Sequence, residues 1–205
     1  MGQKRLEGAI AAFQAGDHNS QIQVEWKPYI LNPSMTTNGE DLEEYCIRRW
    51  GSSSWINRLK QEGRKSGAPF ENWNWACNTM KSHRLIKFAN ERYGVDTGKS
   101  NAAIFKALYE DGKNISLVDT LVEIGLELAL NVPSANANEL RQYLESDEGE
   151  DEVIAEVDKG KRTYKISGVP FFLIEAAAAD ARPYSLSGAQ NKETFLELFQ
   201  ELDEV

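Results

Sequence analysis

Hydrophobic residues recur at helical spacing near both ends of the chain. Leu6, Ile10 and Phe13 lie at positions i, i+4 and i+7, which predicts an amphipathic helix over about residues 3–14. The C-terminal stretch NKETFLELFQELDEV repeats this spacing. A helix with one apolar stripe normally covers a core. We therefore expect an opening helix and a closing helix, each with one buried face.

Residues 22–26 alternate between apolar and polar positions instead. Ile22, Val24 and Trp26 would share one face of a strand, because successive side chains on a strand point to opposite faces. Pro28 cannot donate a hydrogen bond to a neighbouring strand, so regular pairing should stop there. This segment is predicted to be a strand that faces the core.

Two more short strands are predicted close to the C-terminus. The run GVPFFLI, at residues 168–174, is continuously apolar and typical of a buried strand. A second strand is expected near residues 183–186, after a turn.

Residues 39–145 show helical spacing throughout. Gly63 and Gly94 are expected to end helices, and Asn101, Ser116 and Ser134 are expected to cap them. The predicted helices lie within EDLEEYCIRRW, SSSWINRLKQEG, NTMKSHRLIKFANERYG, NAAIFKALYEDG, SLVDTLVEIGLELAL and SANANELRQYLES. The order is therefore helix, strand, many helices, two strands and a final helix.

Composition and charge narrow the class of protein. The chain has 205 residues, of which 41% are hydrophobic and 27% charged, which is typical of a globular protein. Its net charge of -9 opposes binding to the phosphate backbone of nucleic acids. No apolar run has the length of a membrane span, and the first residues lack the apolar core of a signal peptide. We expect a cytoplasmic protein that binds neither nucleic acid nor membrane.

Residue types with catalytic or metal-binding chemistry are few. Cys46 and Cys77 cannot form a disulfide scaffold, and no zinc-binding spacing involves them or the histidines. On one helix Cys77 and His83 would point in different directions, so they cannot act as nucleophile and base. We interpret both cysteines as structural, and expect no metal site and no catalytic residue among these groups.

Six segments occur in an order that is characteristic of one family. They are GQKRLEGAIAAF, WKPYILNP, NTMKSHRLIKFA, IFKALYEDGKNIS, SGVPFFLI and LSGAQ. Through them the chain resembles the DsbA-like thioredoxin-domain oxidoreductases of the FrnE type over almost its whole length. GVPFF followed by SGAQ is the most specific part of this resemblance.

The resemblance implies an α/β, thioredoxin-like fold with an inserted α-helical domain. Residues 1–34 and 165–205 would form the thioredoxin-like domain, and residues 35–164 the insertion. It also implies that the peptide bond before Pro170 is cis. Val169 would then offer its backbone N–H and C=O to a thiol or disulfide substrate, as a strand edge does. Val169 and Pro170 are thus the predicted substrate-binding residues.

The chain departs from this family at its start. Family members open with a strand and then a Cys-Pro-Trp-Cys or related motif at the N-terminus of the first helix, where the helix lowers the pKa of the thiol. Here Met1-Gly2-Gln3 already stands at that helix. We expect the first strand and both catalytic cysteines to be missing, which leaves a gap beside residues 171–174. A strand of another chain, closure of the flanking strands or a missing true N-terminus would each resolve the gap, and we favour the last.

Three functions stay open on these grounds. The first is thiol–disulfide exchange in the FrnE lineage, with this chain inactive as written. The second is a glutathione-dependent relative, either a 2-hydroxychromene-2-carboxylate isomerase or a kappa-class transferase, in which glutathione would be the cofactor. The third is a thioredoxin-like module that binds a peptide without catalysis. The segments LSGAQ and NTMKSHRLI favour the first, and no other cofactor is expected.

Overall fold

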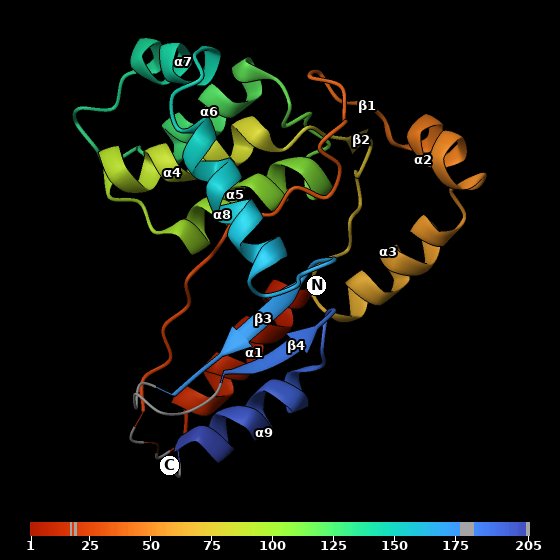
Figure 1. Ribbon diagram of the computed structural model, residues 1–205, viewed down its shortest axis with the longest axis vertical. Helices are drawn as coiled ribbons and strands as arrows, with labels where there is room; N and C mark the ends of the chain where they lie inside the picture. Colours follow the sequence, from red (N-terminus) through yellow and green to blue (C-terminus); the bar gives the residue numbers. More distant parts are fainter. Residues whose placement is uncertain (17, 19, 177–182, 204–205) are drawn as a thin grey trace.

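The computed structural model describes residues 1–16, 18, 20–176 and 183–203. Helices make up most of it and its strands are short, so the protein is a mostly helical α/β structure (Figure 1). The helices are α1 (Gly2–Gln14), α2 (Leu42–Trp50), α3 (Trp55–Lys65), α4 (Met80–Tyr93), α5 (Thr97–Phe105), the π-helical turn η1 (Lys106–Glu110), α6 (Val118–Leu128), α7 (Ala137–Glu145), α8 (Glu150–Arg162) and α9 (Lys192–Asp203). The strands are β1 (Glu40–Asp41), β2 (Trp75–Ala76), β3 (Phe171–Ile174) and β4 (Tyr184–Ser187).

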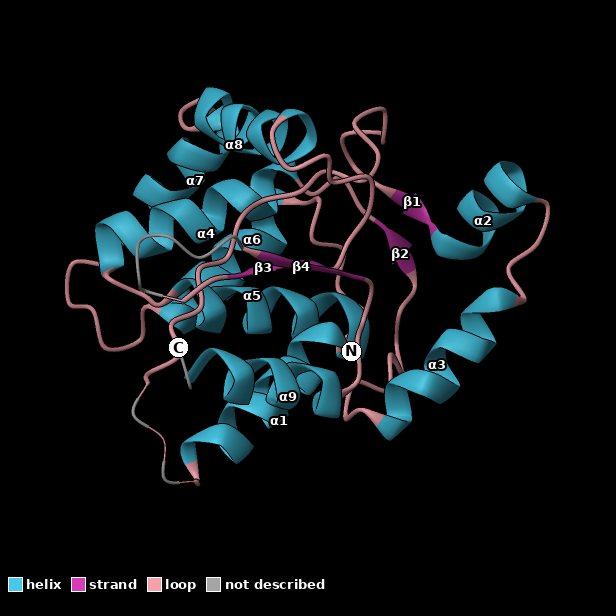
Figure 2. Ribbon diagram, turned by 60° about the horizontal axis from the view of Figure 1, so that its bottom comes forward, coloured by secondary structure: helices cyan, strands magenta, loops and turns pink. Residues whose placement is uncertain are grey.

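The first and last helices pack together with the two C-terminal strands, and we call this part the α1/α9 unit. Strands β3 and β4 pair antiparallel, with Phe172 opposite Leu186. Helices α1 and α9 lie side by side on one face of this pair (Figure 2). The core of the unit consists of Leu6, Ala9, Phe13, Phe195 and Phe199. The predictions of the two terminal helices and of both C-terminal strands are thus confirmed.

The predicted strand at residues 22–26 is wrong. Residues 20–30 form a stretched, irregular segment that pairs with no strand in the described part of the chain (Figure 1). A strand needs a neighbour for its N–H and C=O groups, and β3 pairs there only with β4. His83 holds the segment instead, since its Nε2–H donates a 3.1 Å hydrogen bond to the Tyr29 carbonyl. The two segments that flank the expected gap therefore do not close onto each other.

The largest core lies among helices α4, α5, α6 and α7, which we call the helical cluster. Its fully buried side chains include Leu85, Leu121, Leu140 and Leu144, each 0% exposed. Helix α8 packs against α4, and its C-terminal end leads toward β3 (Figure 1). The division of the chain into residues 1–34 with 165–205 and residues 35–164 stays a prediction.

A buried arginine joins two helices of this cluster. The Arg84 side chain, on α4, is only 1% exposed. It donates hydrogen bonds to the carbonyl oxygens of Glu148 at 2.8 Å and Leu144 at 3.4 Å, and also to that of Tyr143. These carbonyls lie at or just beyond the C-terminal end of α7, which carries partial negative charge. The charge of Arg84 is therefore satisfied by backbone oxygens.

Helices α2 and α3 project to one side of the molecule and form what we call the α2–α3 arm (Figure 2). At its base β1 pairs antiparallel with β2, with Glu40 opposite Ala76. A small core of Met35, Leu42, Tyr45, Cys46 and Ala76 fixes α2 there. The arm thereby carries α3 across to the start of α1.

The predicted helix caps are wrong, although the helices themselves form. Asp96 caps α5 by accepting a 3.0 Å hydrogen bond from the N–H of Lys99, and Asn136 caps α7. These residues, and not Asn101 or Ser134, stand directly before the first helical turn, where the free N–H groups are. The Ser116 hydroxyl instead accepts a hydrogen bond from the backbone of Asn78.

One predicted helix end is confirmed and the other is wrong. Gly94 ends α4 with φ of 66°, a backbone conformation that glycine adopts without strain. Helix α3 continues past Gly63 to Lys65. Gly63 is required there for another reason, because an added Cβ would lie 2.0 Å from the carbonyl oxygen of Ala68.

Candidate functional site

The turn at Val169 and Pro170 lies directly against the start of α1. The Val169–Pro170 peptide bond is cis, as the resemblance implied. A Cβ added at Gly2 would lie 2.9 Å from Cγ of Pro170 and 3.3 Å from Cζ of Phe172, so only glycine allows this approach. The N–H of Gly188 donates a 2.8 Å hydrogen bond to the Pro170 carbonyl. The turn is therefore held between α1 and the loop that follows β4.

Val169 is open to solvent and to an incoming chain. It is 44% exposed, and no hydrogen bond within the described residues engages its backbone N–H or C=O. Leu173, further along β3, is 40% exposed. The predicted burial of this strand is thus only partial. Because β3 has a single described neighbour, its second edge offers backbone groups for an added strand.

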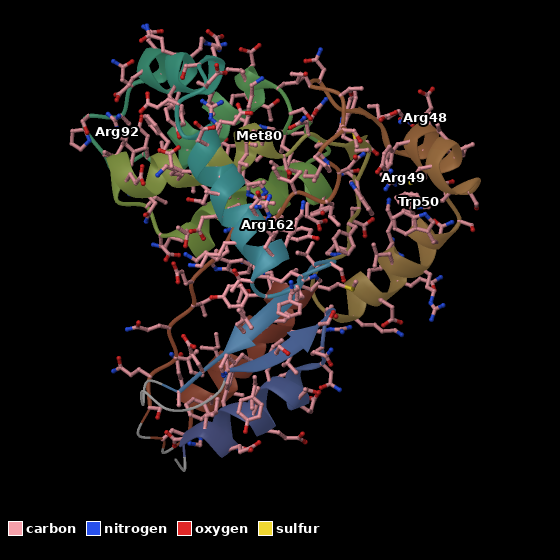
Figure 3. The ribbon with its side chains drawn as sticks, viewed as in Figure 1. Arg48, Arg49, Trp50, Met80, Arg92 and Arg162 are labelled. Atoms are coloured by element: carbon pink, nitrogen blue, oxygen red, sulfur yellow. The ribbon has the colours of Figure 1, made fainter. Side chains whose placement is uncertain are left out.

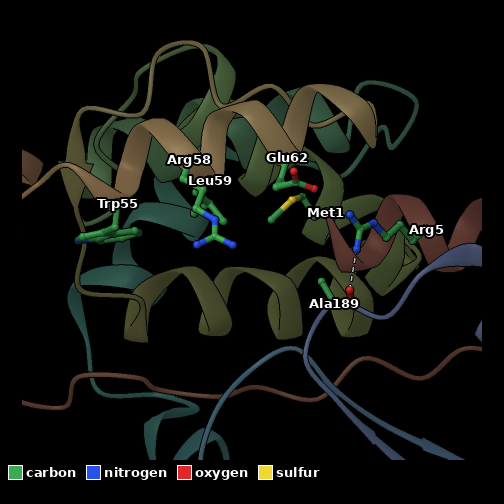
Figure 4. Close-up of a pocket in the computed structure, with 7 residues that line it drawn as sticks. All are labelled: Met1, Arg5, Trp55, Arg58, Leu59, Glu62 and Ala189. Atoms are coloured by element: carbon green, nitrogen blue, oxygen red, sulfur yellow. Dashed lines mark hydrogen bonds between the residues drawn. The ribbon is translucent and has the colours of Figure 1, made fainter.

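A pocket of about 290 Å³ opens between the start of α1 and helix α3 (Figure 4). Its walls include Met1, Arg5, Trp55, Arg58, Leu59 and Glu62. Ala189, in the loop after β4, closes the remaining side. Since the neighbouring Gly188 binds the Pro170 carbonyl, the pocket and the Val169–Pro170 turn share one loop.

Arg5 fixes the shape of this pocket. Its Nε–H donates a 2.9 Å hydrogen bond to the Ser66 hydroxyl, and one Nη1–H donates a 2.6 Å hydrogen bond to the Ala189 carbonyl. Ser66 is the residue that ends α3. A single guanidinium thereby joins α1, the end of α3 and the loop after β4.

Arg58 lines the same pocket but, among the described residues, is not held by hydrogen bonds as Arg5 is. Its guanidinium points into the space beside Leu59 (Figure 4). Within the part of the chain that the structure describes, it makes no hydrogen bond and no ion pair. Glu62 lies one turn further along the same helix (Figure 4), and a hydrogen bond from Lys65 and the nearby charges of Arg5 and Arg58 lower its pKa. One of the two arginine charges is therefore left without a counter-charge in the pocket.

Neither cysteine is placed for nucleophilic chemistry. Cys46 is 0% exposed, and burial together with Asp41 and Glu43 raises the pKa of its thiol. Burial also raises the pKa of Cys77, whose Sγ lies 3.4 Å from Oδ1 of Asn114. The two thiols are free and unpaired. Because the thiolate is the reactive form, both environments suppress reactivity.

The two histidines also have structural partners. Burial lowers the pKa of His83, which is hydrogen-bonded to Tyr29. His18 stacks on Phe13 with ring centroids 3.9 Å apart, and its Nδ1 lies 3.1 Å from Oδ2 of Asp203. Across the described residues, no group of three or more histidine, cysteine, aspartate or glutamate side chains is arranged to hold a metal ion.

The DSBA-like thioredoxin domain family matches residues 1–200 of the chain. The chain belongs to this family. The thioredoxin-like fold that the sequence suggested is thus supported at the level of the family. A search of curated proteins found no match.

This DSBA-like domain places Met1 and Gly2 at the N-terminal end of α1, while both cysteines lie elsewhere. Cys46 is in α2, within the small core of the α2–α3 arm, and Cys77 packs against the helical cluster. The interpretation of both as structural residues agrees with these positions. Among the described helices, none is both long enough and apolar enough to cross a membrane.

Sequence reasoning missed the charged pocket of this domain. Arg58 and Trp55 belong to a helix that the sequence predicts, but no motif marks them as site residues. Arg5 lies in α1, far from them in the sequence. Only the folded chain, in which the α2–α3 arm reaches the start of α1, brings the three together.

Proposed function

We propose that this DSBA-like thioredoxin domain binds thiol or disulfide substrates on its Val169–Pro170 turn, as part of thiol–disulfide exchange of the FrnE type. The observation that carries the proposal is the open backbone of Val169 beside an unpaired edge of β3. Membership of the family supports it. The substrate would be a peptide or a small thiol such as glutathione.

The docking step follows from backbone chemistry. An extended substrate can donate to the Val169 carbonyl and accept from its N–H, as an added strand does at a sheet edge. The turn is held by Gly188 and by the close contact of Pro170 with Gly2. A rigid acceptor loses little conformational entropy on binding, which favours affinity.

The exchange chemistry needs a thiolate that this site does not itself supply. A thiolate attacks a disulfide sulfur and releases the other sulfur as a thiol. Burial of Cys46 and Cys77 opposes thiolate formation at either residue. The expectation that a strand and two catalytic cysteines belong before residue 1 stays a prediction, which the intact mass of the protein from its own source would test.

Two substitutions of Val169 test the docking step. The probe is a short peptide whose single cysteine is a mixed disulfide with methanethiol, with binding measured by calorimetry. Val169→Pro removes the N–H donor and should weaken binding about tenfold, the value of one backbone hydrogen bond at its upper range. Val169→Ala keeps the backbone groups and is the matched control, with a change of about twofold or less.

Equal binding by both variants would contradict the proposal, because the N–H would then contribute nothing. Circular dichroism and the thermal midpoint establish that each variant is folded. A loss of binding in a folded Val169→Pro chain, with binding retained in Val169→Ala, is the expected result.

A non-catalytic binding module is the second candidate function. The unreactive environments of both thiols favour it. An insulin-reduction assay on the protein purified from its own source, the material used for the intact-mass measurement, separates the two candidates. Turnover that depends on the protein would support thiol–disulfide exchange, whereas peptide binding without turnover would support the module.

A further inference from the structure

The pocket between α1 and α3 concentrates positive charge in an acidic protein. The chain carries a net charge of -9, yet Arg5 and Arg58 both line this one pocket. Arg5 donates hydrogen bonds to the Ser66 hydroxyl and the Ala189 carbonyl, and both of these acceptors are uncharged. Arg58 has no hydrogen-bond or ion-pair partner among the described residues. A free guanidinium that points into a pocket is suited to bind a carboxylate.

A flat apolar wall stands beside this charge. Trp55 is 38% exposed and lines the pocket together with Leu59. Its ring meets Trp50 edge to face with centroids 5.4 Å apart, and Trp73 with centroids 6.0 Å apart. Two aromatic neighbours therefore fix the orientation of the indole before any ligand arrives. A planar apolar group can pack on it at little entropic cost.

The carboxylate of Glu62 does not cancel the pocket's charge. Its Oε1 accepts a 2.8 Å hydrogen bond from Lys65, so its charge is already shared with a lysine. Two arginines thus face one carboxylate that has a partner of its own. The volume of about 290 Å³ lies at the lower limit for ligand pockets and suits a small ligand or one substrate side group.

We infer that this pocket binds a small organic carboxylate with a planar apolar group, the carboxylate on Arg58 and the planar group on Trp55. Ala189 places the pocket on the loop that also holds Pro170. Resting on the proposed function, the pocket then selects thiol or disulfide substrates that carry a carboxylate and an apolar group near the sulfur. The α2–α3 arm would thereby contribute specificity to a site whose docking turn belongs to the α1/α9 unit.

The test compares two probes of equal shape and different charge. These are 2-naphthoate and its neutral amide, 2-naphthamide, each titrated by calorimetry. The protein should bind the acid about tenfold more tightly, since a hydrogen bond to a charged group is worth that much or more. Neither probe contains sulfur, so the result is independent of the Val169 test: failure here removes the substrate class and leaves the docking turn standing.

Arg58→Met should weaken binding of 2-naphthoate about tenfold and leave that of 2-naphthamide unchanged. Arg49→Met is the matched control. Arg49 lies on α2 with its guanidinium 5.7 Å from the Trp50 ring, and it does not line the pocket (Figure 3). The same loss in both variants would overturn the inference, because net charge alone would then explain binding.

A gain of affinity gives a second measurement, which a misfolded variant cannot imitate. Glu62→Gln removes the one carboxylate that faces the ligand and releases Lys65. Binding of 2-naphthoate should tighten about two- to fivefold, the size of an exposed charge interaction. Unchanged or weaker binding in Glu62→Gln, or equal affinity of the wild-type protein for acid and amide, would contradict the inference.

Discussion

The helical cluster and the α1/α9 unit differ in the size of their hydrophobic cores and in how much of their backbone is left unpaired. The helical cluster has a large core in which four leucines are wholly buried, and its internal Arg84 donates hydrogen bonds to three backbone carbonyls. The α1/α9 unit has a core of five residues under a two-stranded sheet, with Leu173 and Val169 exposed. A two-stranded sheet, in which each strand has one unpaired edge, is marginal in isolation. The helical cluster thus provides most of the buried core, whereas the α1/α9 unit carries the backbone groups that are free to bind a ligand.

The difference follows from what each backbone can satisfy by itself. Helices pair their own N–H and C=O groups, so a bundle needs only side-chain packing to be complete. A strand depends on its neighbours, and β3 has a single described neighbour. The unpaired edge of β3 can therefore accept a substrate as an added strand.

Arg84→Met should have the largest effect of the changes considered for this comparison. It would remove the hydrogen bonds that Arg84 donates to three backbone carbonyls at the end of α7, so the free energy of unfolding should fall by about 2–4 kcal/mol. Of these carbonyls, that of Tyr143 would still accept a hydrogen bond from the Ser146 hydroxyl. Urea unfolding measures it. Arg92→Met, on the exposed outer end of α4 (Figure 3), is the control and should change stability by about 0.5 kcal/mol or less. Similar values for both variants would show that Arg84 is not a structural centre of the cluster.

A change at His83 should have an intermediate effect on folding stability, and this effect should depend on pH. Burial lowers its pKa below the ordinary value of 6.5, so the folded protein favours the neutral ring. Its contribution to stability is complete above pH 6.5 and is lost as the pH falls through the lowered pKa of His83.

His83→Gln isolates this contribution, because glutamine keeps an N–H donor for the Tyr29 carbonyl but does not titrate. Urea unfolding of both proteins from neutral to mildly acidic pH should show a steeper loss for the wild type below pH 6.5. Parallel curves would mean that the pKa of His83 is the same in the folded and unfolded chains.

The smallest expected change in stability concerns two tyrosines of the helical cluster. The rings of Tyr93 and Tyr143 contact Phe88, with centroids 5.2 Å and 4.7 Å away respectively. The Tyr93 hydroxyl accepts a hydrogen bond from the Asn136 N–H at 3.3 Å, so Tyr93→Phe should cost about 1 kcal/mol. The Tyr143 hydroxyl is buried without a partner among the described residues, so Tyr143→Phe should leave stability unchanged or raise it by about 0.5 kcal/mol. Thermal unfolding compares the pair, and an equal loss in both would place an unseen partner at Tyr143.

The sequence predicts helices of this protein well and long-range pairing poorly. Periodicity locates α1 and α9, and Gly94 marks the end of α4, because these signals are local. Alternation at residues 22–26 is equally local, but a strand also needs a partner, which no local pattern guarantees. The cap predictions fail for a related reason: the residue directly before each helix supplies the cap, and several polar residues compete for that place.

The candidate site divides in the same way. Val169 and Pro170 follow from a resemblance that rests on short motifs, and the structure places them beside an open strand edge. Arg58 and Trp55 carry no sequence signal, since their role depends on how the α2–α3 arm meets the start of α1. No local sequence pattern predicts that the α2–α3 arm contacts the start of α1.

Hydrogen exchange of individual amides, with and without the methanethiol mixed-disulfide peptide, tests the central claim most directly. If substrates dock on the Val169–Pro170 turn, the peptide should slow exchange at Val169 and along β3 and leave the amides of the helical cluster unchanged. Protection confined to the helical cluster, or no protection at Val169 at saturating peptide, would contradict the account.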